Sequence, residues 1–166
     1  MDRVIFACVH NAGRSQMAAA FFNRMADPSR ARAISAGTEP GDRVHAVVAE
    51  AMREAGIDVS QNRPRRLTVD LARDASLLVT MGCGEQCPSV PGLQRDDWPL
   101  PDPKGRPLTE VREIRDEVRD RVAALIRSRY WSRTPSTPMC RTEEKRPRPR
   151  AWRPALAGPQ RVPAVS

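Results

Sequence analysis

The chain has 166 residues, 40% of them hydrophobic, and a formal net charge of +8 at pH 7. This length suits one domain with one core, and without an apolar run of about 18 residues no membrane span is expected. Residues 131–166 hold seven Arg, one Lys and two Glu, so they carry +6 of the charge and leave +2 for residues 1–130. The folded part is thus close to neutral, which argues against a nucleic-acid partner.

The first half of the chain predicts two strand–helix pairs. A short apolar run at residues 3–7 predicts a buried strand, because it is too short for the core of a signal peptide. We therefore expect a cytoplasmic protein. Helical spacing of apolar residues predicts a helix over 15–25, a second strand follows at 32–36, and an amphipathic helix covers 43–55 before Gly56.

The second half continues the alternation. It predicts a short helix at 68–73, strands at 76–81 and 95–98, and a last helix over 108–130. Strands that alternate with helices predict an α/β fold whose parallel sheet is covered on both faces. In such sheets the functional site lies at the carboxyl ends of the strands.

Residues 131–166 differ in composition from the rest. They hold seven of the 16 prolines and show no apolar periodicity. We expect a domain over residues 1–130 followed by a Pro- and Arg-rich disordered extension over 131–166.

The most informative segment is a C-x5-R loop that begins at Cys8 and ends at Arg14, between the first strand and the first helix. Five intervening residues let the backbone N–H groups converge on one tetrahedral oxyanion, and the helix directs its positive end at the same point. Arg14 adds a bidentate guanidinium, and this positive environment favours the thiolate form of Cys8. The residues expected to bind the anion are Val9, His10, Asn11, Ala12, Gly13, Arg14 and Ser15. The alternative, a buried cysteine beside a chance arginine, does not explain the Asn, Gly and Ser within the loop.

A nucleophile that attacks an oxyanion requires a proton donor for the departing oxygen. Asp102 lies between two prolines, which hold its carboxyl steady. We assign it as the general acid; the alternative is an ordinary Asp-Pro turn.

Two more cysteines follow the third strand, at positions 83 and 87. Cys83 could attack Cys8 once substrate is bound, and Cys87 could then attack Cys83, which would move the oxidising equivalent to an exposed disulfide. Incidental free thiols are the alternative, whereas a zinc site would need a second ligand pair that the sequence lacks. We expect no metal and no other cofactor, and Cys140 is expected to be incidental.

Together these segments resemble the thioredoxin-coupled arsenate reductases, which share a fold with low-molecular-weight protein tyrosine phosphatases. The resembling stretches are CVHNAGRSQMA at 8–18, SAGT at 35–38, TMGCGEQCP at 80–88, DWPLPDP at 97–103 and VREIRDEV at 111–118. The resemblance implies a three-layer sandwich with a four-stranded parallel sheet.

The resemblance also implies roles for the site residues. Cys8 would attack arsenate, Arg14 and the loop amides would bind the oxyanion, and Asp102 would protonate the leaving oxygen. A Cys8–Cys83 disulfide would release arsenite, and a Cys83–Cys87 disulfide would then be reduced by thioredoxin or a small-thiol system. Two features depart from the family pattern: only three residues separate Cys83 from Cys87, and Ala19 replaces an expected acidic residue.

Two other functions stay open. The same loop can hydrolyse phosphate monoesters, although Lys104 and Gly105 follow Pro103 where phosphatases of this fold carry aromatic residues. A non-catalytic protein could instead bind an acidic partner through the basic extension, although two tryptophans, Trp131 and Trp152, offer little for stacking on bases.

Overall fold

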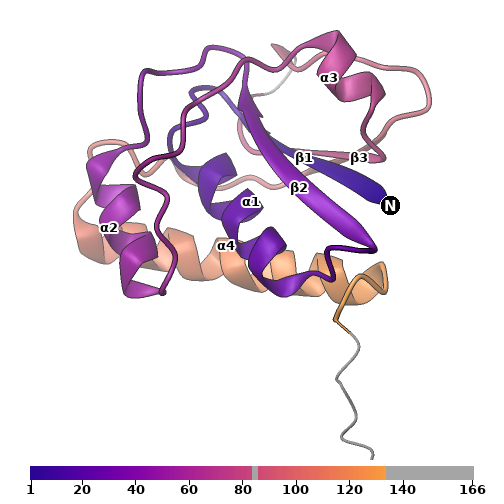
Figure 1. Cartoon of the computed structure of the whole chain (residues 1–166). Helices are drawn as coiled ribbons and strands as arrows, with labels where there is room; N and C mark the ends of the chain where they lie inside the picture. Colours follow the sequence, from indigo (N-terminus) through magenta and orange to yellow (C-terminus); the bar gives the residue numbers. More distant parts are fainter. Residues whose placement is uncertain (84–85, 134–166) are drawn as a thin grey trace, which may run out of the picture. The chain divides into compact units, whose positions relative to one another are not determined.

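The computed structural model describes residues 1–83 and 86–133 (Figure 1). Four strands form one parallel sheet in the order β2-β1-β3-β4. The elements are β1 (Asp2–Cys8), α1 (Arg14–Met25), β2 (Ala31–Gly37), α2 (Ala46–Glu54), α3 (Val69–Arg73), β3 (Leu77–Thr80), β4 (Gln94–Asp97) and α4 (Leu108–Ser128). The predicted α/β sandwich and its four-stranded parallel sheet are confirmed.

The central strand β1 divides the core into two clusters. Its apolar residues are fully buried because helices cover both faces of the parallel sheet. Val4 and Phe6 pack into the larger cluster with α1, α2 and α4, and Ile5 and Ala7 pack into a smaller one with Leu67. Figure 1 shows α1, α2 and α4 on one side of the sheet and α3 on the other.

The carboxyl ends of the strands meet at one edge of the sheet. Cys8 is in register with Gly37, Ala7 with Thr80, and Thr80 with Asp97. The loops that follow these four strands therefore converge there, as expected for this class of fold.

Trp131 belongs to the folded unit, which corrects its assignment to the extension. It is 6% exposed, and its ring packs edge-on against Phe22 with 5.6 Å between centroids. Its indole N–H donates to the carboxylate of Asp2 at 2.9 Å, and Ser132 forms an antiparallel bridge with Ala26. Composition misplaced the boundary because one tryptophan that closes a core leaves no periodic signal. Residues 134–166, including Cys140, lie outside the described residues, and their expected disorder stays a prediction.

Within the described part of the chain, no helix is both long enough and apolar enough to cross a membrane.

Candidate active site

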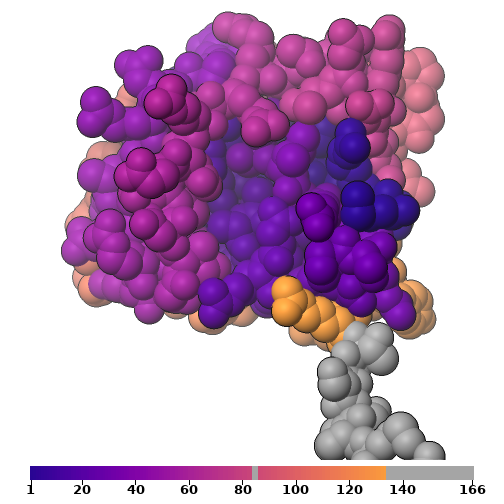
Figure 2. Space-filling view, viewed as in Figure 1, coloured from indigo at the N-terminus to yellow at the C-terminus, as the bar shows by residue number. Residues whose placement is uncertain are grey.

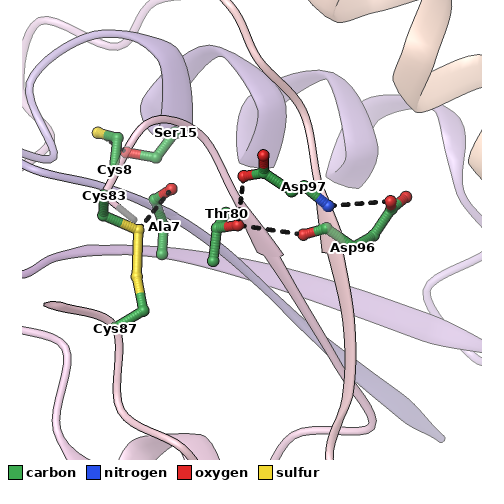
Figure 3. The surroundings of a disulfide bond; sticks show 8 residues. All are labelled: Ala7, Cys8, Ser15, Thr80, Cys83, Cys87, Asp96 and Asp97. Carbon is green, nitrogen blue, oxygen red and sulfur yellow. Dashed lines mark hydrogen bonds between the residues drawn. A yellow bond between two sulfur atoms is a disulfide. The ribbon is translucent and has the colours of Figure 1, made fainter. Parts of the chain in front are cut away.

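Cys8 ends β1 and lies buried beside the start of α1. Its sulfur is 2.9 Å from the hydroxyl oxygen of Ser15, and both side chains are almost inaccessible (Figure 3). Because α1 begins at Arg14, the positive end of its dipole lies next to the sulfur. The predicted pairing of the nucleophile with a helix N-terminus is therefore present.

The side chain of Asn11 donates a hydrogen bond to the Ser15 hydroxyl. The Asn11 Oδ1 accepts from the backbone N–H of Arg65 at 2.9 Å, so its Nδ2 is the end that donates to Ser15 Oγ, at 2.8 Å. Since Ser15 Oγ accepts this bond, its own proton is available for the sulfur of Cys8. Ser15 is therefore able to donate a hydrogen bond to this sulfur.

Asn11 itself adopts a left-handed conformation, with φ of 50°, and is fully buried. Asparagine tolerates this region better than other residues with a side chain. The Nε2 of Gln16 donates to the Asn11 carbonyl at 3.0 Å and holds the same turn. Neither Gln16 nor Arg65 was identified from the sequence: Arg65 lies far from Asn11 along the chain, and Gln16 lies outside the C-x5-R motif.

The carbonyl groups of the C-x5-R loop are held from outside by the segment that follows β2. The C=O groups of Cys8, Val9, His10 and Ala12 accept from the backbone N–H groups of Thr38, Glu39, Gly41 and His45, respectively, at 2.8–3.2 Å. In a peptide unit the N–H points opposite to the C=O. The loop N–H groups are thus turned toward the interior of the loop, where an anion would bind.

Arg14 connects the loop to the two loops that follow β3 and β4. Its guanidinium donates to the carbonyl of Leu100 at 2.8 Å and lies 3.8 Å from the carboxylate of Asp102. Arg14 is 8% exposed. Gly82 has φ of +83°, and a Cβ there would lie 2.7 Å from Arg14 Nη1, so glycine is required at this close approach.

Asp102 lies at the mouth of the site, as predicted. Its side chain is 47% exposed, and its Oδ1 accepts from the backbone N–H of Lys104 at 3.0 Å. Pro103 packs against Gly13, where a Cβ would lie 2.7 Å from the proline ring. The close approach of the proline ring leaves no room for a side chain at Gly13.

His45, the residue that precedes α2, also packs at this edge. Its ring approaches Gly13, where a Cβ would lie 3.7 Å from His45 Cδ2. Burial lowers the pKa of His45, and the nearby charge of Asp102 only partly opposes this.

Cys83 and Cys87 form a disulfide with a Cα–Cα distance of 6.1 Å (Figure 3). Their close spacing in sequence is thus compatible with normal disulfide geometry. Each is only 4% exposed, which corrects the expectation of an exposed disulfide. Among the described cysteines, Cys8 remains a free thiol.

The disulfide and Cys8 lie on opposite faces of the sheet. Cys8 belongs to the larger cluster, whereas both disulfide cysteines pack in the smaller one. The Cys83 sulfur lies 3.8 Å from the carbonyl oxygen of Ala7, the residue before Cys8. The disulfide and the Cys8 thiol therefore both lie near the carboxyl end of β1, but on opposite faces of that strand.

Comparisons with known proteins agree with this geometry. Residues 3–130 match the family of low molecular weight phosphotyrosine protein phosphatases. A Halobacterium salinarum protein, provisionally named an arsenate reductase, is 39% identical over 125 residues, covering 73% of this chain and 88% of the relative. A glutaredoxin arsenate reductase of Synechocystis is 34% identical, covering 76% of this chain and 97% of the relative.

A solved structure is similar as well. The thioredoxin-dependent arsenate reductase of Corynebacterium glutamicum superposes with a TM-score of 0.68 at 38% identity. The match covers 78% of this chain and 62% of that longer one.

Proposed function

Because the chain belongs to the low molecular weight phosphotyrosine protein phosphatase family, matched over residues 3–130, we propose that it uses this fold to reduce arsenate to arsenite. The observation that carries the proposal is the combination of a free Cys8 at the start of α1 with a closed Cys83–Cys87 disulfide on the opposite face of β1. Relatives named as arsenate reductases support the same reaction.

The first step is attack of the Cys8 thiolate on arsenic. Ser15 holds the thiolate, and Arg14 and the loop N–H groups bind the remaining oxygens. One oxygen leaves as water after Asp102, 3.8 Å from Arg14, supplies a proton. The product is a thioester-like Cys8–arsenate adduct with arsenic still in the +5 state.

The second step transfers two electrons to arsenic. The Cys83 thiolate attacks the sulfur of Cys8, a Cys8–Cys83 disulfide forms, and the electron pair of the sulfur–arsenic bond stays on arsenic, which leaves as arsenite. Cys87 then attacks Cys83, and Cys8 departs as a thiolate. The resulting Cys83–Cys87 disulfide is the state that the structure contains.

This sequence of exchanges requires movement of the segment after β3. In the disulfide state Cys83 lies on the face of β1 opposite Cys8, so it must cross the end of the strand to reach that sulfur. Gly82, with its positive φ beside Arg14, lies in this segment just after the end of β3. We infer that reduction of the disulfide releases Cys83 for this movement.

A cytoplasmic dithiol or small thiol must reopen the disulfide. One relative is named for glutaredoxin and one similar structure for thioredoxin. Because both sulfurs are buried here, either reductant would need the segment to open before attack. We propose thioredoxin as the reductant, with a glutaredoxin system as the alternative.

The experiment measures arsenate-dependent NADPH oxidation by the full chain with thioredoxin and thioredoxin reductase, and in parallel with glutathione, glutaredoxin and glutathione reductase. An aryl phosphate is tested alongside. Arsenate turnover supports the proposal. Hydrolysis of the aryl phosphate without arsenate turnover would assign the chain to the phosphatases and leave the disulfide without a function.

A further inference from the structure

A second polar cavity lies away from the C-x5-R loop, between α1, the outer edge of β2 and the segment after α2. It is on the face that Figure 2 shows. Its volume is about 240 Å³, and its lining includes Gln16, Asn23, Ser35, Arg63 and Arg65. The described residues that line it include two arginines and no acidic side chain, so its charge favours an anion.

The edge of β2 leaves one donor open in this cavity. The backbone N–H and C=O of Ala33 point away from β1 and form hydrogen bonds with the side-chain amide of Asn23. The N–H of Gly37 donates to the carbonyl of residue 65, and the C=O of Gly37 accepts from the N–H of residue 67. Hydrogen-bonding directions repeat every second residue along a strand, so Ser35 faces the same edge. Among the described residues, no group pairs with its N–H.

The backbone groups of Ala33 and Gly37, on either side of Ser35, already have hydrogen-bond partners, and this restricts which ligands can bind at the edge of β2. An added peptide strand would need the edge groups of Ala33 and Gly37, which already have partners. A compact ligand needs only the backbone N–H of Ser35 as a hydrogen-bond donor from this edge. Neither Arg63 nor Arg65 forms an ion pair within the described part of the chain, so both guanidinium groups are available.

We propose that this cavity binds a small tetrahedral oxyanion, such as phosphate or sulfate, between Arg63, Arg65 and the N–H of Ser35. Planar guanidinium groups bind such anions through paired hydrogen bonds. Arg32 lines a neighbouring hollow along β2, and its positive charge would attract an anion toward the cavity.

The cavity is connected to the active site through Asn11. Arg65 donates its backbone N–H to Asn11 Oδ1, Gln16 donates to the Asn11 carbonyl, and Asn11 holds Ser15. An anion that fixes residue 65 would therefore stabilise the left-handed turn of Asn11 and, with it, the Ser15–Cys8 contact. This binding does not depend on the proposed reduction of arsenate.

The test is a titration of the ¹⁵N-labelled full chain with sodium sulfate at constant ionic strength, followed by amide chemical shifts. Sulfate is neither reduced nor hydrolysed, so binding alone is measured. We expect a saturable shift of the Ser35 amide. The Arg63→Ala/Arg65→Ala variant should bind at this site about tenfold more weakly, or not at all. Arg53→Ala, which removes an exposed charge elsewhere, should behave as the parent chain.

A second variant separates this cavity from the C-x5-R loop, at which we also expect sulfate to bind. In Arg14→Ala the loop loses its guanidinium, and the shifts of Ser35 and Asn11 should persist with one common midpoint. If the Ser35 shift disappears in Arg14→Ala, or persists at full affinity in Arg63→Ala/Arg65→Ala, it reports binding at the loop and the second site does not exist. A spectrum with dispersed amides confirms that each variant is folded.

Discussion

The Ser15 hydroxyl oxygen lies 2.9 Å from the Cys8 sulfur and accepts a hydrogen bond from Asn11, which leaves the hydroxyl proton free for the sulfur. This arrangement places a hydroxyl group against the Cys8 sulfur at the start of α1, at the base of the C-x5-R loop. It also links Cys8 to the side chain of Asn11, which reaches the sulfur only through Ser15.

Replacing Ser15 by Ala should slow alkylation of Cys8 by iodoacetamide at neutral pH by about tenfold, since one hydrogen bond to the thiolate is lost. The rate is followed by mass spectrometry at the Cys8 peptide. Ser128→Ala, at an exposed hydroxyl in α4, is the matched control and should react as the parent chain. Equal rates for Ser15→Ala and the parent would show that the contact does not support the thiolate.

Asn11 combines a strained backbone with buried hydrogen bonds. Asn11→Ala loses the side-chain bonds and keeps the positive φ, so it should lower the free energy of unfolding by about 2–3 kcal/mol in urea. Asn11→Gly relieves the backbone strain only, and should recover about 1 kcal/mol of that loss. If the two variants are equally stable, the left-handed turn is not a source of strain.

Alanine substitutions at Gly82 and Gly92 distinguish the effect of backbone strain from that of a steric collision with Arg14. Gly82 and Gly92 have φ of +83° and +80°, but only Gly82 has a neighbour, the guanidinium of Arg14. Alanine at either position should cost about 1 kcal/mol of stability. Only Gly82→Ala should also raise the KM for arsenate, because it displaces Arg14. Comparable kinetic effects in Gly92→Ala would exclude the collision as the cause.

The boundary of the folded unit can be tested by truncation. A chain ending at residue 133 should unfold at the same urea concentration as the full chain. A chain ending at residue 130 loses Trp131 and should be less stable by about 3–4 kcal/mol, as is Trp131→Ala. Equal stability of the two truncated chains would mean that Trp131 does not close the core.

His45 gives a pH dependence with a defined sign. Its folded-state pKa lies below the usual 6.5 because burial disfavours the charged ring. The unfolded chain therefore binds more protons, and stability falls as pH drops through 6.5 toward the lower folded-state value. His45→Gln should flatten this part of the profile in urea unfolding, whereas an unchanged slope would exclude His45 as its source.

Much of the fold and site followed from local sequence patterns. The C-x5-R loop is predictable because strand, loop and helix are continuous in the chain, and the order of elements limits the sheet topology. Asp102 lies 3.8 Å from Arg14 because the carboxyl ends of parallel strands meet at one edge, and its role as general acid stays a prediction.

Other features depend on contacts between distant segments and left no local signal. The hydrogen bonds from residues 38–45 to the carbonyl groups of the C-x5-R loop join backbone atoms only, so the side chains give no sign of them in the sequence. The burial of Cys83 and Cys87 depends on apolar residues such as Leu67 on another segment. The cavity beside Ser35 exists only once α1, β2 and the loop after α2 pack together.

The central claim is that two electrons reach arsenic through an exchange between Cys8 and Cys83. The most direct measurement is disulfide mapping by mass spectrometry after one arsenate turnover of the reduced Cys87→Ser chain, in a Cys140→Ser background. Without Cys87 the exchange should stop at the Cys8–Cys83 disulfide, formed only when arsenate is added and with one equivalent of arsenite released. Absence of an arsenate-dependent Cys8–Cys83 bond, with Cys8 still reactive to iodoacetamide, would contradict the relay.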